Sequence, residues 1–125
     1  MTDPLRIHAI LPPDITELTR QDDEDDYTYP IRVRFHRDLT DFEKKVCKEL
    51  GYETDDMNLR DQLYPVTTLL IKDASLDHPE IHEEIKNELE TINAEVAERR
   101  SAHDKVVART TEVSAQLTDG LTPTD

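Results

Sequence analysis

The sequence has only two glycines, Gly51 and Gly120, and one cysteine, Cys47, in 125 residues. Phosphate-binding loops, dinucleotide fingerprints and nucleophile elbows all need closely spaced glycines, so two isolated glycines exclude these sites. A single cysteine cannot form an intrachain disulfide, which excludes the disulfide scaffold of small secreted proteins. We expect Cys47 to pack as a small apolar side chain, because a nucleophilic thiol would need a nearby base.

Long hydrophobic segments are also missing. The longest strongly apolar run consists of Leu69, Leu70 and Ile71, far too short to cross a bilayer. The first residues lack the basic region and apolar core of a signal peptide. From these features we expect a cytoplasmic protein with no membrane partner.

Positive charge is scarce relative to negative charge. There are 29 acidic residues against 15 lysines and arginines, and the formal net charge is −14. Nucleic acids and anionic membranes bind positive surfaces, so direct nucleic-acid binding is not expected. Solubility is the simplest explanation of the charge. The alternative is an acidic surface that attracts a basic protein or mimics DNA.

The composition limits the size of the core. Hydrophobic residues make up 35% of the chain, aromatic residues only 5%, and tryptophan is absent. A chain of this length and polarity can form one modest domain, with a good part of its residues outside the core.

Two segments near the N-terminus alternate like half-buried strands. Residues 5–11 form the first, which Pro12 and Pro13 end, and residues 31–37 form the second. The expected core faces consist of Leu5, Ile7, Ala9 and Leu11 in the first strand and of Ile31, Val33 and Phe35 in the second. The two strands can pair, joined by residues 14–29. That connection contains five consecutive acidic residues, 22–26, which favour an extended loop.

Helix signals follow the second strand. Thr40 and Glu43 have the spacing of a capping box, and Gly51 suits the position after a helix end, so we predict a helix over 41–50. Residues 55–64 predict a short helix that carries Leu59 and Leu63. Residues 66–72 are consistent with either a third strand or a helical turn.

The C-terminal third predicts one long helix. Asp77 is the expected N-cap and Pro79 lies in the first turn. No glycine or proline interrupts residues 80–119, so we predict a helix over 76–117, after a head at 1–75 and before a disordered tail at 118–125. A helical hairpin is the alternative, because Ser101 and Asp104 could cap a new helix after Arg100.

The long helix has the 3.5-residue period of a coiled coil. One core position of the heptad is taken by His82, Leu89, Val96, His103, Thr110 and Leu117, and the other by Ile85, Ile92, Arg99, Val106 and Val113. The predicted partner contact consists of Ile85, Leu89, Ile92 and Val96, with Arg99 and His103 restricting the register. In a parallel dimer, Glu95 and Arg100 of opposite chains would pair. Three uses remain open: self-association, packing on the protein's own head, and docking on another protein.

Basic side chains gather on one face of the predicted strands: Arg6, His8, Arg32, Arg34 and His36. They would pair with local acids, including the 22–26 loop, or form a docking face for an anionic partner.

No pattern in the sequence predicts catalysis or a cofactor. His78 and His82 have a zinc-ligand spacing, but a third ligand is missing, so no metal is expected. The sequence therefore predicts an α+β head followed by a long amphipathic helix, in a non-enzymatic protein that self-associates or docks on a protein through that helix. The alternative function is an acidic, phage-type inhibitor that covers a basic protein surface.

Overall fold

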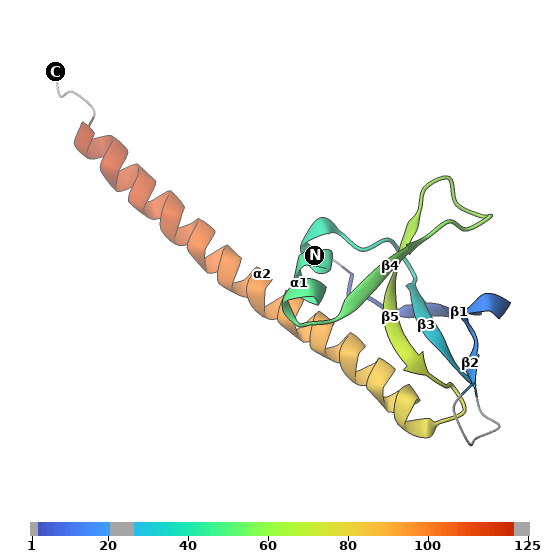
Figure 1. Ribbon diagram of the computed structural model, residues 1–125. Helices are drawn as coiled ribbons and strands as arrows, with labels where there is room; N and C mark the ends of the chain where they lie inside the picture. Colours follow the sequence, from blue (N-terminus) through green and yellow to red (C-terminus); the bar gives the residue numbers. More distant parts are fainter. Residues whose placement is uncertain (1–2, 21–26, 122–125) are drawn as a thin grey trace. The chain divides into compact units, whose positions relative to one another are not determined.

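The computed structural model describes residues 3–20 and 27–121. This part of the chain contains five strands, two α-helices and one short 3₁₀ helix (Figure 1). In chain order they are β1 (Ile7–Leu11), η1 (Ile15–Glu17), β2 (Thr19–Arg20), β3 (Tyr27–Phe35), α1 (Asp41–Glu49), β4 (Glu53–Met57), β5 (Val66–Ala74) and α2 (Pro79–Leu121). The predicted α+β class with a long C-terminal helix is confirmed, although two or three strands were expected.

The strands form one antiparallel sheet in the order β1-β3-β5-β4, with β2 paired to the start of β3. The core face of β3 is the predicted one, because Ile31, Val33 and Phe35 are all buried. Val33 lies opposite Leu69 of β5, and Ile31 lies opposite Ile71. Directly opposite residues share one face of a sheet, so these side chains form the centre of the core.

Residues 66–72, for which strand and helix both remained open, are a strand. β5 lies between β3 and β4, and its first four residues are buried. A strand paired on both sides accommodates a run of β-branched residues well. Near its end, Asp73 has a positive φ of 52° where the pairing with β3 shifts register.

The predicted short helix at residues 55–64 is wrong. Residues 53–57 form strand β4 instead, and Leu63 is 95% exposed in the turn that follows. Strand β5 supplies the reason, because it pairs with residues 53–57, and its Thr67 hydroxyl donates a hydrogen bond to Asp56. From β3, one strand further on, the Arg32 side chain donates a hydrogen bond to Asp55. Tertiary pairing therefore overrides the weak strand propensity of these acids.

The alternation predicted for residues 5–11 holds only in part. The pairing of β1 with β3 shifts register between Ile7 and Ala9, as at a β-bulge. One extra residue exchanges the faces of everything that follows it. Ile10 consequently lies opposite the buried Val33, where the alternation had placed Ala9. Ile7 lies before the bulge and opposite Phe35, and it is 39% exposed.

Helix α1 begins at the predicted residue, Asp41, and ends at Glu49, one residue before the predicted end. The Glu43 N–H donates to the Thr40 hydroxyl, and the Glu43 carboxylate accepts from the Thr40 N–H, which completes the capping box. Gly51 follows the helix with φ of 82°. Val46 and Cys47 are fully buried and fix the helix to the sheet.

Helix α2 is one uninterrupted helix of 43 residues. It begins at Pro79, so His78 and not the predicted Asp77 precedes the first helical residue. Proline suits that first position because its missing N–H is not needed there. The hairpin alternative is wrong, and the helix continues past residue 117 to Leu121. The remainder of the predicted tail, 122–125, and the acidic run 22–26 lie outside the described residues.

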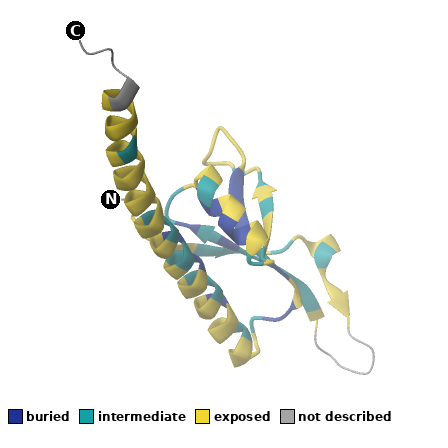
Figure 2. Ribbon diagram, turned by 90° about the vertical axis from the view of Figure 1, so that its left-hand side faces the viewer, coloured by how far each residue is buried: buried dark blue, intermediate teal, exposed yellow. Residues whose placement is uncertain are grey.

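The chain divides into two compact units, Met1–Asn93 and Ala94–Asp125. The boundary lies within α2 and not before it, because the first turns of α2 belong to the same unit as the sheet. Figure 2 colours the chain by burial: the core of the first unit is dark blue, and residues 101–112 of α2 are exposed throughout.

Candidate interaction surface

The strongest part of the predicted coiled-coil stripe lies in the protein's own core. Ile85 is 5% exposed and Ile92 is fully buried, while Leu89 is half-buried. Both isoleucines belong to the first unit, together with the sheet. The structure therefore places them where packing on the head was expected. Isoleucine side chains buried in this way are not accessible to a second chain.

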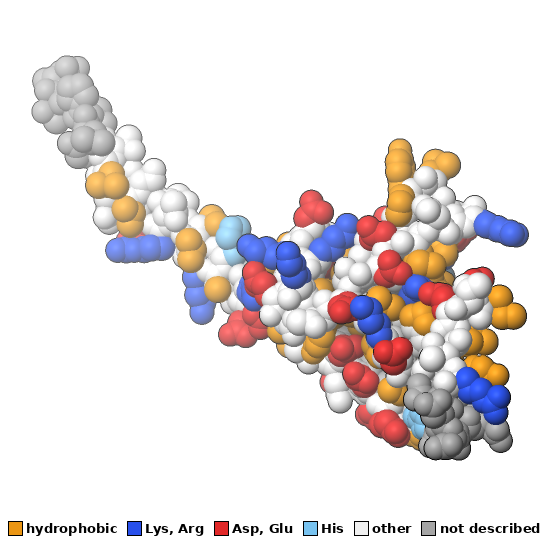
Figure 3. All heavy atoms as spheres, in the orientation of Figure 1, with side chains coloured by type: hydrophobic (Ala, Val, Ile, Leu, Met, Phe, Trp, Pro, Cys, Tyr) orange, Lys and Arg blue, Asp and Glu red, His pale blue; other side chains and the backbone are white. Residues whose placement is uncertain are grey.

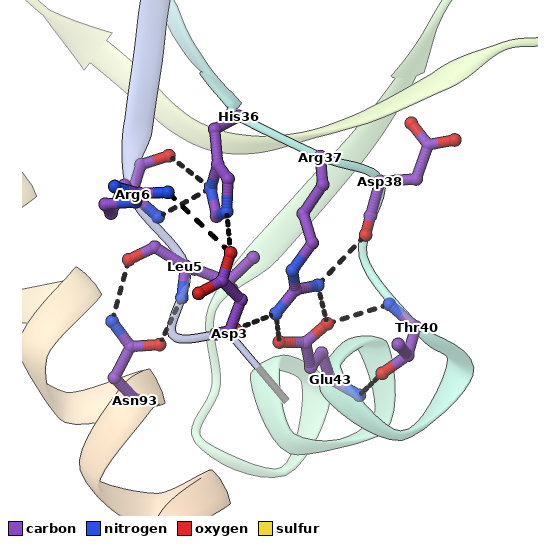
Figure 4. A network of polar contacts seen from close by, with 9 residues as sticks. All are labelled: Asp3, Leu5, Arg6, His36, Arg37, Asp38, Thr40, Glu43 and Asn93. Atoms are coloured by element: carbon purple, nitrogen blue, oxygen red, sulfur yellow. Dashed lines mark hydrogen bonds and ion pairs between the residues drawn. The ribbon is translucent and has the colours of Figure 1, made fainter. Parts of the chain in front are cut away.

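Asn93 follows directly after the buried Ile92 in α2. Its side-chain amide donates a hydrogen bond to the Leu5 carbonyl and accepts one from the Leu5 N–H, both at 2.9 Å (Figure 4). The helix is thereby joined to the backbone just before β1. Nothing in the sequence pattern indicates this contact, because an asparagine in a polar heptad position has no distinctive signal.

The next turns of α2 are polar. Val96 is buried, and the Arg99 side chain donates a hydrogen bond of 2.8 Å to Glu95, one turn earlier. His103 is exposed. The predicted Arg99 layer thus already has a carboxylate partner within its own chain, which lowers the cost of desolvating the guanidinium group.

An apolar groove lies on the C-terminal part of α2. It is lined by Val106, Thr110, Val113 and Leu117, which repeat at intervals of four, three and four residues. Val106 is 59% exposed and Leu117 is 62% exposed. Figure 3 shows hydrophobic and basic side chains along this part of the helix, while acidic side chains gather over the unit that contains the sheet. We call residues 103–117 the exposed seam.

The exposed seam was part of the predicted heptad pattern, but of its residues only His103 belonged to the predicted contact. The contact was predicted at the stripe from Ile85 to Val96 because that stripe is more hydrophobic than residues 103–117. The stripe lies directly after the helix start, and the residues of the helix nearest the head are the ones that the head can cover. This position could have indicated that the stripe packs on the head and not on a partner.

The predicted basic sheet face is paired with acids. Arg32 donates two hydrogen bonds, of 2.9 and 2.6 Å, to the Glu17 carboxylate and a third, of 2.8 Å, to Asp55. Its guanidinium group lowers the pKa of Glu17 to about 2. Arg34 lies 3.1 Å from Asp61. This is the pairing with local acids that the sequence allowed, and docking of an anionic partner on this face stays a prediction.

Two further basic side chains of that face meet at the N-terminus. Arg6 and His36 both contact the Asp3 carboxylate, at 3.7 and 3.3 Å (Figure 4). His8 is exposed. Beside them, Arg37 binds the buried Glu43 through two hydrogen bonds of 2.7 and 2.9 Å. The bonds from Arg37 and Thr40 lower the pKa of Glu43 against the effect of burial.

A shallow groove in the first unit contains Glu88 of α2. Tyr52, Glu53, Lys72 and Glu84 also line it. One carboxylate oxygen of Glu88 is buried without a hydrogen-bond partner among the described residues. Burial, and secondarily the charge of Glu84, raises the pKa of Glu88 to about 7. The carboxyl group is therefore partly protonated at neutral pH.

The residues considered for chemistry are separated. Cys47 is fully buried, and burial raises its pKa to about 11, so the thiolate is not populated at neutral pH. His82 interacts with the Leu76 carbonyl, and His78 lies 3.9 Å from Glu80. Among the described residues, no three histidines, cysteines or acids gather as a metal site would require.

No family model, curated protein or solved structure matches this chain. Within residues 3–20 and 27–121, the helices are all too short or too polar for a membrane span.

Proposed function

We propose that this protein is a non-enzymatic assembly protein that associates through the exposed seam of α2. The observation that carries the proposal is the row formed by Val106, Thr110, Val113 and Leu117 on one exposed helix face. The three apolar side chains of this row recur with the 3.5-residue period of helices that pair along their length, and Thr110 is the one polar position among them.

The proposal transfers the contact from the first half of α2 to the second. The earlier apolar residues, Ile85 and Ile92, stabilise the first unit. The seam between His103 and Leu117 keeps the heptad spacing, and its core positions are exposed apart from the half-buried Val113. A single polypeptide can thus use one helix for two tasks, because the same 3.5-residue period serves an internal core and an external contact.

The distribution of charge along α2 supports the same surface. Residues 99–119 contain four basic and three acidic residues, a net charge of +1, and residues 80–98 contain one basic and seven acidic residues, a net charge of −6. A nearly neutral surface on a chain of net charge −14 meets less repulsion from other acidic proteins than the first half of α2 does.

A pair of matched variants tests the proposal. Val113→Glu places a charge in the seam, and Ala115→Glu places the same charge about 200° away around the helix, at 100° per residue. Both changes introduce glutamate, which is a good helix former. Light scattering behind a sizing column measures the molar mass. The protein concentration should be about 0.1–1 mM, because a small interface is expected to have a weak dissociation constant. We expect wild type and Ala115→Glu to associate and Val113→Glu to be monomeric.

The same variants test docking on another protein. If wild type is monomeric, partners captured from cell extract should be lost with Val113→Glu and kept with Ala115→Glu. A monomeric wild type with equal capture by both variants overturns the proposal. Capture that survives both substitutions but disappears at 0.5 M salt, at which charges are screened within about 4–5 Å, would instead indicate an acidic inhibitor.

A further inference from the structure

The exposed seam has a composition that is better matched by its own copy than by a strongly charged partner. Its core positions contain no acidic or basic residue other than His103. Among the side chains that line the groove, only Arg109 is charged. A basic partner would find no row of acids beside this seam, and an acidic partner would find only Arg109. A second copy supplies the same apolar row, and the side chains beside that row are uncharged except for Arg109.

The two possible orientations of such a pair differ in how far the seams overlap. In a parallel pair, residues meet their own copies, so Val106, Val113 and Leu117 each form an entirely apolar layer. The layer of His103 lengthens the overlap of the parallel pair by about one helical turn. In the antiparallel pair with matched apolar residues, Val106 meets Leu117 of the second copy and Thr110 meets Val113. The next layer would join His103 to Gly120, so the overlap ends after four layers.

Shifting the antiparallel pair to lengthen its overlap introduces unfavourable contacts. Centring the pair on residue 108 places Arg109 beside Arg109 of the second copy and Leu117 beside Arg99. In the parallel pair, Ala102 faces Val107 across the seam and Arg109 faces Ser114. This arrangement covers Val107, which is 47% exposed, and brings no like charges together between residues 106 and 117. Toward the first unit, the core layers of His103 and Arg99 would each meet their own copy, so the favourable layers are those from Val106 to Leu117.

We propose that the occupant of the exposed seam is a second copy of this chain, in parallel orientation and in register. The inference rests on the proposed function and specifies its partner. The first units, Met1–Asn93, are then carried at the same end of the paired helices, because each continues directly into its seam. The net negative charge of the chain is concentrated in the first units and not in the seam. Repulsion between the first units therefore opposes the pairing at low ionic strength.

Single cysteines distinguish the orientations. Val106→Cys and Leu117→Cys are made separately, and each is oxidised in a glutathione buffer. Native Cys47 does not interfere because it is fully buried. In the parallel pair each variant meets its own copy, so both should form disulfide-linked dimers at least about tenfold faster than the outward-facing control Ala115→Cys. A mixture of the two variants should yield few dimers that join residue 106 to residue 117.

The outcomes separate the inference from the proposed function. In the antiparallel pair, residues 106 of the two copies are about 16 Å apart along the axis, so single variants cannot cross-link and only the mixture can. That result overturns the parallel orientation and leaves assembly through the seam intact. A chain that is monomeric by light scattering and cross-links no faster than the control overturns the second copy as occupant.

Salt gives an independent measurement with the unmodified protein. Repulsion between the acidic first units extends over a screening length of about 30 Å at 10 mM salt and about 8 Å at 150 mM. The parallel pair should therefore dissociate about tenfold more readily at 10 mM than at 150 mM salt. Equal dissociation constants at both concentrations overturn the proposed orientation.

Discussion

The side-chain amide of Asn93 forms both hydrogen bonds that a neighbouring strand would form with the backbone of Leu5. It accepts from the Leu5 N–H and donates to the Leu5 carbonyl, at 2.9 Å each. Leu5 itself is buried, so neither backbone group has ready access to water as a substitute. This single residue therefore joins helix α2 to the segment that leads into β1.

Asn93→Ala should destabilise the protein. The substitution leaves the N–H and the carbonyl of Leu5 without partners, which costs about 1–3 kcal/mol in the free energy of unfolding. Chemical denaturation measures the change. Asn87→Ala, at an exposed position of the same helix, is the control and should change stability by less than about 0.5 kcal/mol. Equal effects of the two substitutions would show that the contact with Leu5 contributes nothing.

Glu88→Gln should stabilise the protein at neutral pH. The folded-state pKa of Glu88 is raised to about 7 from the ordinary 4.5, so folding opposes ionisation of this group. Stability from Glu88 is therefore complete below pH 4.5 and decreases as the pH rises from 4.5 to about 7. Because the carboxyl group is partly open to solvent, we expect a gain of about 1–2 kcal/mol at pH 7.5 rather than the full value of the shift.

The pH profile provides the control for Glu88. Unfolding free energies measured between pH 4.5 and 8 should differ between wild type and Glu88→Gln mainly at the upper end. Glu90→Gln changes the same charge at an exposed site of α2 and should follow the wild-type profile. A gain that is independent of pH would mean that relief of general acidic repulsion, and not the buried carboxyl group, explains the effect.

Glu17→Gln should reduce the loss of stability that occurs as the pH falls from neutral to acidic values. Arg32 lowers the folded-state pKa of Glu17 to about 2, so its contribution is complete above the ordinary value of 4.5 and is lost as the pH falls toward 2. The variant should be less stable than wild type by about 1 kcal/mol at pH 7, and the difference should disappear near pH 2. Denaturation at pH 7, 4 and 2 measures it. A difference that persists at pH 2 would contradict an ionic cause.

Cys47 should not react with thiol reagents in the folded protein. Its side chain is fully buried and its pKa is raised to about 11, first by burial and then by the charges of Glu43 and Glu88. With a disulfide reagent at pH 8, we expect one equivalent of thiol to react rapidly in denaturant and none to react rapidly without it. Rapid reaction of the native protein would show that α1 opens readily from the sheet.

Local signals in the sequence determined α1, the core face of β3 and the existence of α2. In each case the information lies within a few residues: the capping box of Thr40 and Glu43, the alternation of Ile31, Val33 and Phe35, and the absence of helix breakers over 80–119. Short-range hydrogen bonds and side-chain period act before distant contacts form, so such elements can be predicted from sequence.

Tertiary structure decided the remaining elements. Residues 53–57 form a strand because they pair with β5, and the side chains of Arg32 and Thr67 bind Asp55 and Asp56 there. A bulge in β1 moved Ile10 to the core face, which no alternation pattern could reveal. In both cases the deciding partner lies on another strand.

The candidate surface shows the same division. The heptad period of α2 is a property of the sequence, and it continues from His82 to Leu117 without indicating which part faces the protein's own core. Only the folded chain separates Ile85 and Ile92, which the first unit buries, from Val106 and Leu117, which remain exposed. Periodicity specifies which side of a helix is apolar, whereas burial depends on what the rest of the chain places against that side.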